Sequence, residues 1–214
     1  MPRTLQPELL DSLPPDHSDA LHSRRDLRWI NWIMGNHRWF TRTLPRYVHS
    51  GERVLELGAG TGELGQRLGT HRVCVDGLDF APRPASWPAA QAWHVSDLRY
   101  FTAYDRYPAV LANLILHHLT DRELANLGDT LAGSARIIVA CEPHRSRRSQ
   151  RLFALVGPLF GANHVTRHDA QVSIAAGFRG DELPRALGLR SSAWHCECTT
   201  TTLGAYRMLA LRRP

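Results

Sequence analysis

Short apolar runs alternate with longer amphipathic stretches through the middle of the chain. The five runs that predict strands are residues 53–57, 72–78, 92–95, 109–116 and 136–141. Several of them are almost continuously apolar, which is typical of parallel strands that are covered on both faces. Thr120 and Glu123 form a capping box, which predicts a helix that ends near Gly133. Alternating strands and helices of this kind indicate a doubly wound α/β sheet.

The two ends of the chain follow other patterns. From residue 19 to residue 48 apolar side chains recur at helical spacing, with a break at Gly35. Near the carboxyl end, residues 194–201 and 205–211 predict two β segments joined by a turn at Gly204. We therefore expect a mostly parallel sheet with an antiparallel C-terminal hairpin and an N-terminal helical cap.

These patterns divide the chain into three parts. Residues 1–18 contain prolines that break any helix, so we expect a flexible leader there. The prolines of the leader are Pro2, Pro7, Pro14 and Pro15. Residues 19–48 form the helical cap, and residues 49–214 form the main domain, with an insertion at about 144–185.

Composition narrows the class of protein. A chain of 214 residues with 43% hydrophobic and 21% charged residues suits one globular domain with a small cap. The formal charge of +6 favours an anionic partner, but all 26 basic residues are arginines, which indicates codon bias rather than a selected surface. No apolar run approaches the roughly 20 residues of a membrane span, and no secretory signal is recognisable. We expect a cytoplasmic protein.

The cysteines and histidines do not reveal a metal site in the sequence. The four cysteines are Cys74, Cys141, Cys196 and Cys198. Their spacing matches neither a zinc site nor a redox pair. We therefore expect reduced cysteines in or near the core, and no bound metal.

A glycine-rich loop follows the first predicted strand. The segment runs Glu56-Leu-Gly58-Ala59-Gly60-Thr-Gly62. Glycines let the backbone turn sharply and approach a ligand closely, because no Cβ stands in the way. A dinucleotide-binding loop has its third glycine three positions after its second, and this loop lacks that interval. The acid before the first glycine is unexpected at a pyrophosphate site and suits a cationic ligand.

At these residues the sequence resembles the class I methyltransferases that use S-adenosylmethionine (AdoMet), whose first motif is E/D-x-G-x-G-x-G. The resemblance covers about residues 44–141 and implies a Rossmann-like methyltransferase fold with AdoMet as cofactor. It implies that Asp79 binds the ribose diol, to which a carboxylate offers two acceptor oxygens. Asp76 is the weaker candidate for this role, because it lies inside the predicted strand.

The same resemblance assigns the other ends of the cofactor. It implies that Asp97 accepts from the adenine amino group and that Asn113 lines the methionine end of the pocket. The cofactor-binding residues implied in this way are Glu56, Gly58, Ala59, Gly60, Gly62, Asp79, Phe80, Asp97, Leu98 and Asn113.

Three histidines are candidates for catalysis. Methyl transfer from a sulfonium mainly needs an acceptor held in line and shielded from water, and a base only where the acceptor must lose a proton. His117 and His118 follow the fourth predicted strand, at the edge where open α/β sheets bind ligands. Either could act as a base, orient the acceptor or pack beside the cofactor. His168 lies in the insertion that builds the acceptor pocket in this family, but neighbours such as His168 and Asp169 do not face each other on a helix.

The acceptor class follows from what the fourth strand lacks. Nucleic-acid amino-methyltransferases carry Asn/Asp-Pro-Pro-aromatic there, whereas this chain has Asn113-Leu-Ile-Leu116, and the Pro-Cys pair of cytosine-C5 enzymes is absent. We expect a small-molecule methyltransferase that acts on oxygen or carbon of a hydrophobic or aromatic acceptor of lipid or polyketide type. The alternatives are a non-catalytic AdoMet-binding partner subunit and an RNA methyltransferase.

A basic run in the insertion leaves one further question open. Arg145, Arg147, Arg148 and Arg151 directly precede the apolar stretch 152–160. Such a segment can lie in a membrane interface, which would suit a hydrophobic acceptor. It can equally be a core helix with a solvated start.

Overall fold

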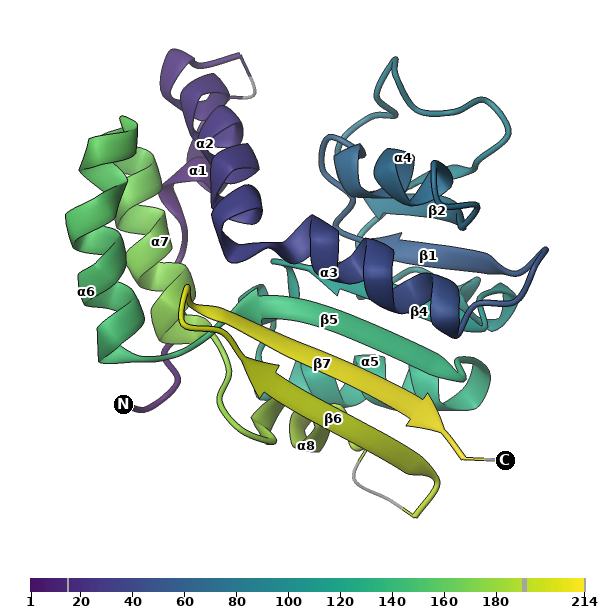
Figure 1. Ribbon diagram of the computed structural model, residues 1–214. Coiled ribbons are helices and arrows are strands. Elements are labelled where there is room, and N and C mark those ends of the chain that lie inside the picture. The colour runs from purple at the N-terminus through teal and green to yellow at the C-terminus, as the bar shows by residue number, and fades with distance from the viewer. Residues whose placement is uncertain (15, 190–191, 214) are drawn as a thin grey trace.

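A computed structural model describes residues 1–14, 16–189 and 192–213 (Figure 1). Pro15, one of the leader prolines, lies outside the described residues. The strands are β1 (Arg53–Leu57), β2 (Cys74–Asp79), β3 (Trp93–Val95), β4 (Ala109–Asn113), β5 (Ile137–Pro143), β6 (Trp194–Thr200) and β7 (Ala205–Arg212). The α-helices are α1 (Leu9–Ser12), α2 (Ser18–Met34), α3 (Asn36–Thr43), α4 (Glu63–Gly69), α5 (Asp121–Ser134), α6 (Arg147–Val156), α7 (His164–Ala176) and α8 (Glu182–Ala186). Short 3-10 turns are η1 (Leu44–Arg46), η2 (Tyr104–Arg106), η3 (Leu116–His118) and η4 (Gly157–Phe160).

All of these strands belong to one sheet. Their order is β3-β2-β1-β4-β5-β7-β6. Neighbours from β3 to β5 pair in parallel, and β7 runs antiparallel to both β5 and β6. The doubly wound α/β sheet with an antiparallel C-terminal hairpin is therefore confirmed. So is the capping box of α5, in which Thr120 and Glu123 bond each other's backbone.

Two apolar layers cover the sheet. Alternate side chains of the central strands, such as Val54 and Leu111, pack against α3 and α4 on one face. The side chains between them, such as Leu55 and Val110, pack against α5 and α8 on the other face. Burial on both faces explains why these strands are continuously apolar rather than alternating.

The fourth strand is shorter than the apolar run predicted. β4 ends at Asn113 instead of residue 116, because Leu114 adopts a left-handed φ of +58° and the chain turns into η3. The buried carboxylate of Glu142, at the end of β5, accepts the N–H groups of Ile115 (3.1 Å) and Leu116 (2.9 Å). These bonds replace strand pairing, and hydrophobicity alone does not reveal them.

Helix α2 of the cap and helices α6 and α7 of the insertion lie together beyond one end of the sheet (Figure 1). Gly35 separates α2 from α3 with a φ of +66°, as the break in the helical pattern predicted. α2 packs against α7, which also contacts α6 and α1. Within the described part of the chain, no helix is both long enough and apolar enough to cross a bilayer.

The described residues of the expected leader lie against the domain. Residues 1–14, called the N-terminal strap below, dock along α7 and the turn η3. The carboxylate of Asp169 accepts the N–H groups of Leu9 (2.7 Å) and Leu10 (2.9 Å), at the first turn of α1. Prolines prevent a long helix here, but they do not prevent an extended segment from docking on a domain.

Candidate functional site

The glycine loop between β1 and α4 adopts a backbone conformation that disfavours residues with a side chain. Gly58, Gly60 and Gly62 all have left-handed φ values, between +55° and +75°. A Cβ on Gly58 would lie 2.7 Å from the side chain of Ile115, and one on Gly62 would lie 2.6 Å from the ring of Trp87. At Gly60 the same atom would meet only open space and one carbonyl at 4.0 Å. The loop is therefore packed at both ends and accessible in the middle.

Glu56 places an unusual acid under this loop. Its side chain is buried, and its Oε2 has no hydrogen-bond partner among the described residues. Burial raises the pKa of Glu56 to about 8, and the charge of Asp79 adds to this shift. A buried hydrogen-bond acceptor without a donor is rare in the core of a folded protein. The arrangement is suited to a ligand that brings a cation or an N–H donor.

The two acids of β2 have different environments. Asp79, at the carboxyl end of the strand, accepts the N–H groups of Gly60 (2.7 Å) and Ala81 (2.8 Å), and both its partners belong to loops. Asp76 is 1% exposed and is held by Arg53 inside the structure. Asp79 thus lies at the glycine loop with acceptor capacity left over, whereas Asp76 has a structural role.

The residues expected at the adenine end lie after β2 and β3. Phe80 is 68% exposed, so its ring is available to a ligand, and Leu98 is buried. Asp97 is bound by Arg99, whose Nε lies 2.8 Å from Oδ2, and this hydrogen bond lowers the pKa of Asp97. Arg99 also bonds Glu123. Part of the acceptor capacity of Asp97 is therefore already taken by a neighbour.

Asn113 faces the helical cap. Its Nδ2 donates to Asn31 (3.0 Å) and its Oδ1 accepts from Asn36 (3.1 Å), on either side of the break between α2 and α3. The thiol of Cys141 donates to the same Asn36. The side chain of Asn113 therefore fixes the cap over the end of β4. A contact with a ligand would come from its main chain.

His117 is enclosed by two carboxylates. Its Nδ1 lies 2.7 Å from Glu142 Oε2, and its Nε2 lies 3.5 Å from Glu8 Oε1 of the N-terminal strap. Burial alone would lower the pKa of His117, but its bonds to Glu142 and Glu8 raise it to about 9. His117 is therefore a buried anchor for the strap rather than a freely accessible base.

His118 is the more accessible of the two neighbours. Its side chain is 29% exposed, against 4% for His117. Its Nε2 lies 3.9 Å from Glu8 Oε1 and its Nδ1 lies 3.8 Å from Asp11 Oδ2. Burial and the charge of His117 lower the pKa of His118. A neutral imidazole with partial access to solvent can accept a proton or bind an electrophile.

The structure separates His168 from these histidines. His168 is half exposed on α7 and lines another hollow, beside Phe153 and Pro158. Its Nδ1 does lie 2.9 Å from Asp169 Oδ1, so the two neighbours interact although helix geometry argued against it. The imidazole ring of His168 folds back onto the short side chain of Asp169. That carboxylate also holds the strap, so the pair belongs to the docking of α1.

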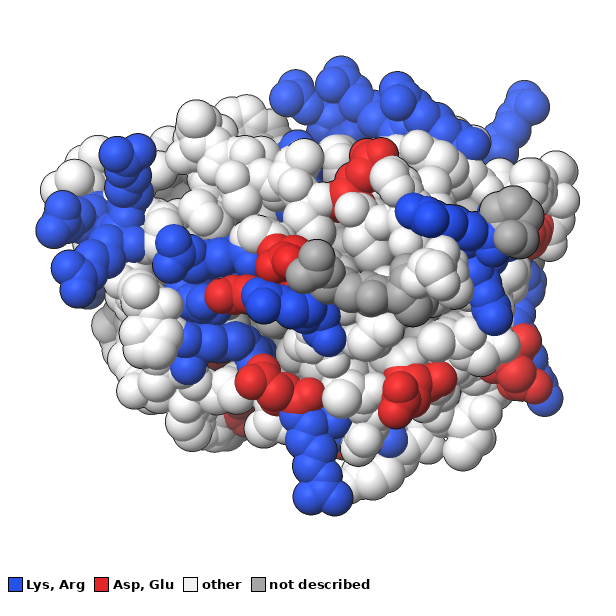
Figure 2. Space-filling view, turned by 90° about the horizontal axis from the view of Figure 1, so that it is seen from below, with Lys and Arg blue, Asp and Glu red and all other residues white. Residues whose placement is uncertain are grey.

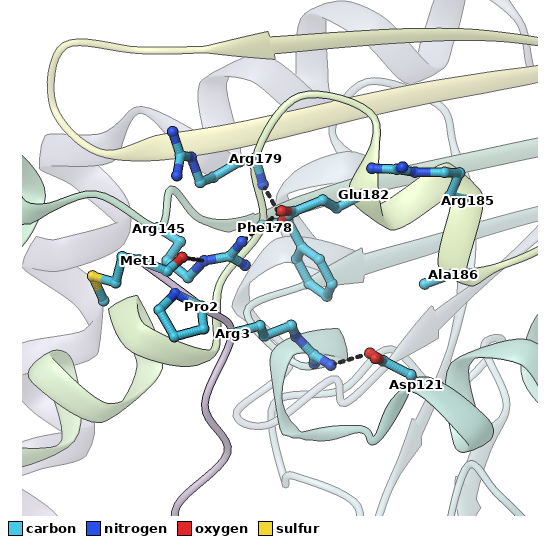
Figure 3. A pocket seen from close by; sticks show the side chains of 10 residues that line it. All are labelled: Met1, Pro2, Arg3, Asp121, Arg145, Phe178, Arg179, Glu182, Arg185 and Ala186. Atoms are coloured by element: carbon cyan, nitrogen blue, oxygen red, sulfur yellow. Dashed lines mark hydrogen bonds and ion pairs between the residues drawn. The ribbon is translucent and has the colours of Figure 1, made fainter.

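A cavity of about 630 Å³ lies where the strap begins (Figure 3). Arg145 crosses its wall and donates to the main-chain oxygens of Met1 (3.0 Å) and Gly177 (2.7 Å) and to Glu182 (2.5 Å). Arg3 pairs with Asp121 at 2.7 Å across the cavity. These arginines are used in fastening the strap. Arg145 is 4% exposed, so it does not belong to the solvated basic run in which the sequence placed it.

Several residues of this region had no signal in the sequence. Glu8, Asp11 and Asn36 reach the site from the leader and the cap, more than 70 positions before the strands they meet. Of these residues Glu142 was the easiest to find in the sequence, since it is an acid at the carboxyl end of an apolar run.

The functional residues form two adjoining regions, a glycine loop with acids and a cluster of imidazoles and carboxylates. Ile115 connects them, because it touches Gly58 and precedes η3.

Comparison with known proteins supports the fold. No protein-family model matches the chain, and no curated protein sequence is significantly similar to it. The structure is similar to that of the plantazolicin methyltransferase BpumL in complex with SAH (S-adenosylhomocysteine), with a TM-score of 0.73 at 9% identity over 96% of this chain and 93% of that one.

Two further structures are similar. Magnesium protoporphyrin IX methyltransferase (ChlM) from Synechocystis PCC 6803, also with bound SAH, has a TM-score of 0.54 at 16% identity over 95% of this chain and 91% of that one. A protein described for the conversion of a disulfide bond into a thioacetal group during echinomycin biosynthesis has a TM-score of 0.57 at 16% identity, over 83% and 81%. At these identities the likeness shows the fold, which is that of the class I AdoMet-dependent methyltransferases.

Proposed function

We propose that this chain is an AdoMet-dependent methyltransferase that methylates oxygen or carbon of a small hydrophobic or aromatic acceptor. The observation that carries the proposal is the buried carboxylate of Glu56, whose Oε2 has no hydrogen-bond partner among the described residues, beneath the accessible glycine loop. AdoMet brings an ammonium group and a sulfonium, both of which a buried carboxylate stabilises. The three SAH-bound or natural-product proteins of the same fold give independent support.

The residues present fit the cofactor. The methionine end would lie against Glu56 and the main chain at Gly58, the ribose against Asp79, and the adenine between Phe80 and Leu98. When bound, AdoMet would supply a methyl group on a positively charged sulfur. The sulfur leaves as a neutral thioether, so its departure needs no base. The chain itself has to hold the acceptor in line and to exclude water. The strap and the helical cap lie at this edge of the sheet and are suited to that task (Figure 1).

The acceptor would lie beside His118, on the far side of Ile115 from the glycine loop. Of the three candidate histidines, His118 combines partial exposure with a lowered pKa. An RNA acceptor is less well supported, because basic side chains on the face drawn in Figure 2 stand in separate groups with acidic ones among them. Phosphate binding would favour a continuous basic track.

Titration calorimetry with SAH tests the cofactor half of the proposal. We expect one site per chain with micromolar affinity. Incubation with AdoMet labelled in its methyl group, together with phenolic and lipid acceptors, tests the transfer. SAH binding without transfer to any acceptor would favour the non-catalytic partner subunit, and absence of SAH binding would contradict both functions.

The Glu56→Gln variant should show opposite effects on ligand binding and on stability. Since the folded pKa of Glu56 is about 8, above the ordinary value of 4.5, its contribution to stability is fully present below pH 4.5 and is lost as pH rises from there to about 8. A glutamine does not ionise, so the unliganded variant should melt at a higher temperature than the wild type at pH 8. Loss of the carboxylate should weaken SAH binding on the order of tenfold. Thermal melts at several pH values and calorimetry measure both effects, and equal SAH affinity in the two proteins would contradict this role of Glu56.

We further propose that α6 and η4 contact an anionic membrane surface, which would suit a hydrophobic acceptor. The exposed apolar side chains Leu155 (73%) and Leu159 (82%) follow the exposed bases Arg148 and Arg151 along the helix. Basic side chains gather at the left margin of Figure 2, the side on which α6 lies in Figure 1. Exposed apolar area flanked by arginine matches the acyl and headgroup layers of an anionic bilayer.

Cosedimentation with vesicles tests this contact. The wild type should bind vesicles that contain phosphatidylglycerol and should dissociate as salt increases. Replacing Arg148 and Arg151 by glutamine should weaken binding roughly tenfold or more, at about 1 kcal/mol per charge. The matched control replaces Arg106 and Arg122, two exposed arginines on other elements. Equal losses in both double variants would show a general charge effect and contradict the proposed surface, as would capture by neutral and anionic vesicles alike.

A further inference from the structure

A cluster of three potential metal ligands lies at the junction of the strap and η3. His117, His118 and Glu8 each offer one ligand atom, and these atoms lie within 4.8 Å of one another. Glu8 Oε1 lies 3.5 Å from the Nε2 of His117 and 3.9 Å from the Nε2 of His118. Ligands around a tetrahedral zinc ion are separated by about 3.3 Å, for metal–ligand bonds of about 2.0–2.1 Å. The two distances from Glu8 Oε1 exceed this spacing by only about 0.2 and 0.6 Å.

The outer nitrogen of each imidazole faces a second carboxylate. His117 Nδ1 lies 2.7 Å from Glu142, and His118 Nδ1 lies 3.8 Å from Asp11. Glu142 is itself fixed by backbone N–H groups, so it holds the ring of His117 with Nε2 toward the cluster. Histidines that bind metals usually donate their other N–H to a carboxylate in this way, because it sets the tautomer and makes the ligand nitrogen more basic. Both imidazoles of this cluster have such a partner within reach.

The charge of the cluster also favours a cation. Three carboxylates, those of Glu8, Asp11 and Glu142, surround two imidazoles. Arg3 of the strap donates to the main-chain oxygens of His117 and Leu119 and to the carboxylate of Asp121, so these donors are not bonded to the ligand atoms. A divalent ion would neutralise most of the remaining negative charge. The 29% exposure of His118 gives such an ion a route of entry.

We propose that Glu8, His117 and His118 bind a divalent transition-metal ion of the zinc type. Two imidazoles and one carboxylate are a donor set that zinc accepts, and three protein ligands leave one position open for water or another molecule. The sequence did not predict this site, because Glu8 belongs to the expected leader and lies 109 positions before His117. The ion would join the strap to the carboxyl edge of the sheet.

Zn²⁺ and Co²⁺ ions themselves are the probes for the test. The full chain is stripped with a chelator, and Zn²⁺ affinity is then measured by competition with a chromophoric chelator. We expect one ion per chain, and a visible absorption band of four-coordinate Co²⁺ when Co²⁺ replaces it. Glu8→Gln and His118→Gln should each weaken binding by at least about a hundredfold, and Asp11→Asn by about tenfold. The matched control is His195→Gln, which removes an exposed histidine paired with Glu197 at 3.0 Å on β6.

Limited proteolysis gives a second measurement. Zn²⁺ should slow cleavage within the strap of the wild type and of His195→Gln, but not of Glu8→Gln. Asp11 is 66% exposed, so Asp11→Asn keeps the test valid if either ligand variant fails to fold. Zn²⁺ affinity that is unchanged in both Glu8→Gln and Asp11→Asn would overturn the site, as would a wild type that binds no ion. SAH binding is measured separately in the same samples, so failure of this site and failure of the proposed function are distinguishable.

Discussion

The Asp79→Ala variant should lose SAH binding by a hundredfold or more while its melting temperature stays close to that of the wild type. Two hydrogen bonds from a ribose diol to a carboxylate contribute about 1.5–3 kcal/mol each, and the loss of about 3–6 kcal/mol weakens a micromolar affinity by more than a hundredfold. The protein loses little, because the N–H groups that Asp79 accepts come from Gly60, which is exposed, and from Ala81, which is partly exposed. Titration calorimetry and thermal melts on the same samples measure the two quantities.

The control for this variant is Asp79→Asn. An asparagine keeps one acceptor oxygen and the shape of the side chain, so SAH affinity should fall between those of the wild type and Asp79→Ala. An Asp79→Ala protein that melts normally and binds SAH as the wild type does would place the ribose elsewhere. That result would contradict the assignment of the site while leaving the fold intact.

The parts of the fold that follow local rules could be predicted from the sequence. β1 matches its apolar run residue for residue, the break at Gly35 separates two helices, and the box at Thr120 begins α5. Each of these depends on residues that are close along the chain. The glycine loop is of the same kind, because its positive φ values require glycine at fixed spacing. Its motif therefore also indicated the fold family.

Other features depend on contacts between distant segments, which the sequence does not display. Prolines in the leader predicted flexibility, but docking of the strap is decided by Asp169 and Arg145, far along the chain. The basic run looked uniform in the sequence, yet Arg145 is buried and bound while Arg148 is exposed. Asn113 was expected to line the methionine end of the pocket, and its amide bonds Asn31 and Asn36 of the cap. In each case the residue type was informative, but its partner could not be identified without the fold.

The two acids of β2 illustrate the same limit and lead to the second large effect. Both are aspartates three positions apart. The family resemblance assigned the ribose to Asp79, and Asp76 was the weaker candidate because it lies inside the predicted strand. In the structure Asp76 Oδ1 accepts the N–H of Ala92 (2.7 Å), and its Oδ2 accepts from Tyr107 (3.0 Å) and from Arg53 (2.6 Å). It therefore joins β1, β2 and the segments before β3 and β4. Its removal should affect stability first.

The Asp76→Ala variant should be destabilised by about 3 kcal/mol. It leaves the N–H of Ala92 without its acceptor and the hydroxyl of Tyr107 with His94 Nε2, at 2.8 Å, as its remaining partner. A donor left without a partner in the interior costs about 1–3 kcal/mol. Arg53 adds little, because its side chain is 40% exposed and regains water when the ion pair is lost. In a domain of this size the melting temperature should fall by roughly 6–12 °C. Chemical denaturation and thermal melts measure the change.

Variants of Asp76 and Asp79 are expected to differ in which property they lose, stability or SAH binding. Asp76→Asn keeps an oxygen for Ala92 or Tyr107, so its free energy of unfolding should lie between those of the wild type and Asp76→Ala. Below its melting transition, Asp76→Ala should still bind SAH within a few-fold of the wild type, since its side chain is 1% exposed and bonded away from the loop. A stable Asp76→Ala protein that has lost SAH binding would reverse the roles of the two acids. Because each variant is expected to change the quantity that the other leaves intact, the pair separates a ligand-binding carboxylate from a structural one without knowledge of the methyl acceptor.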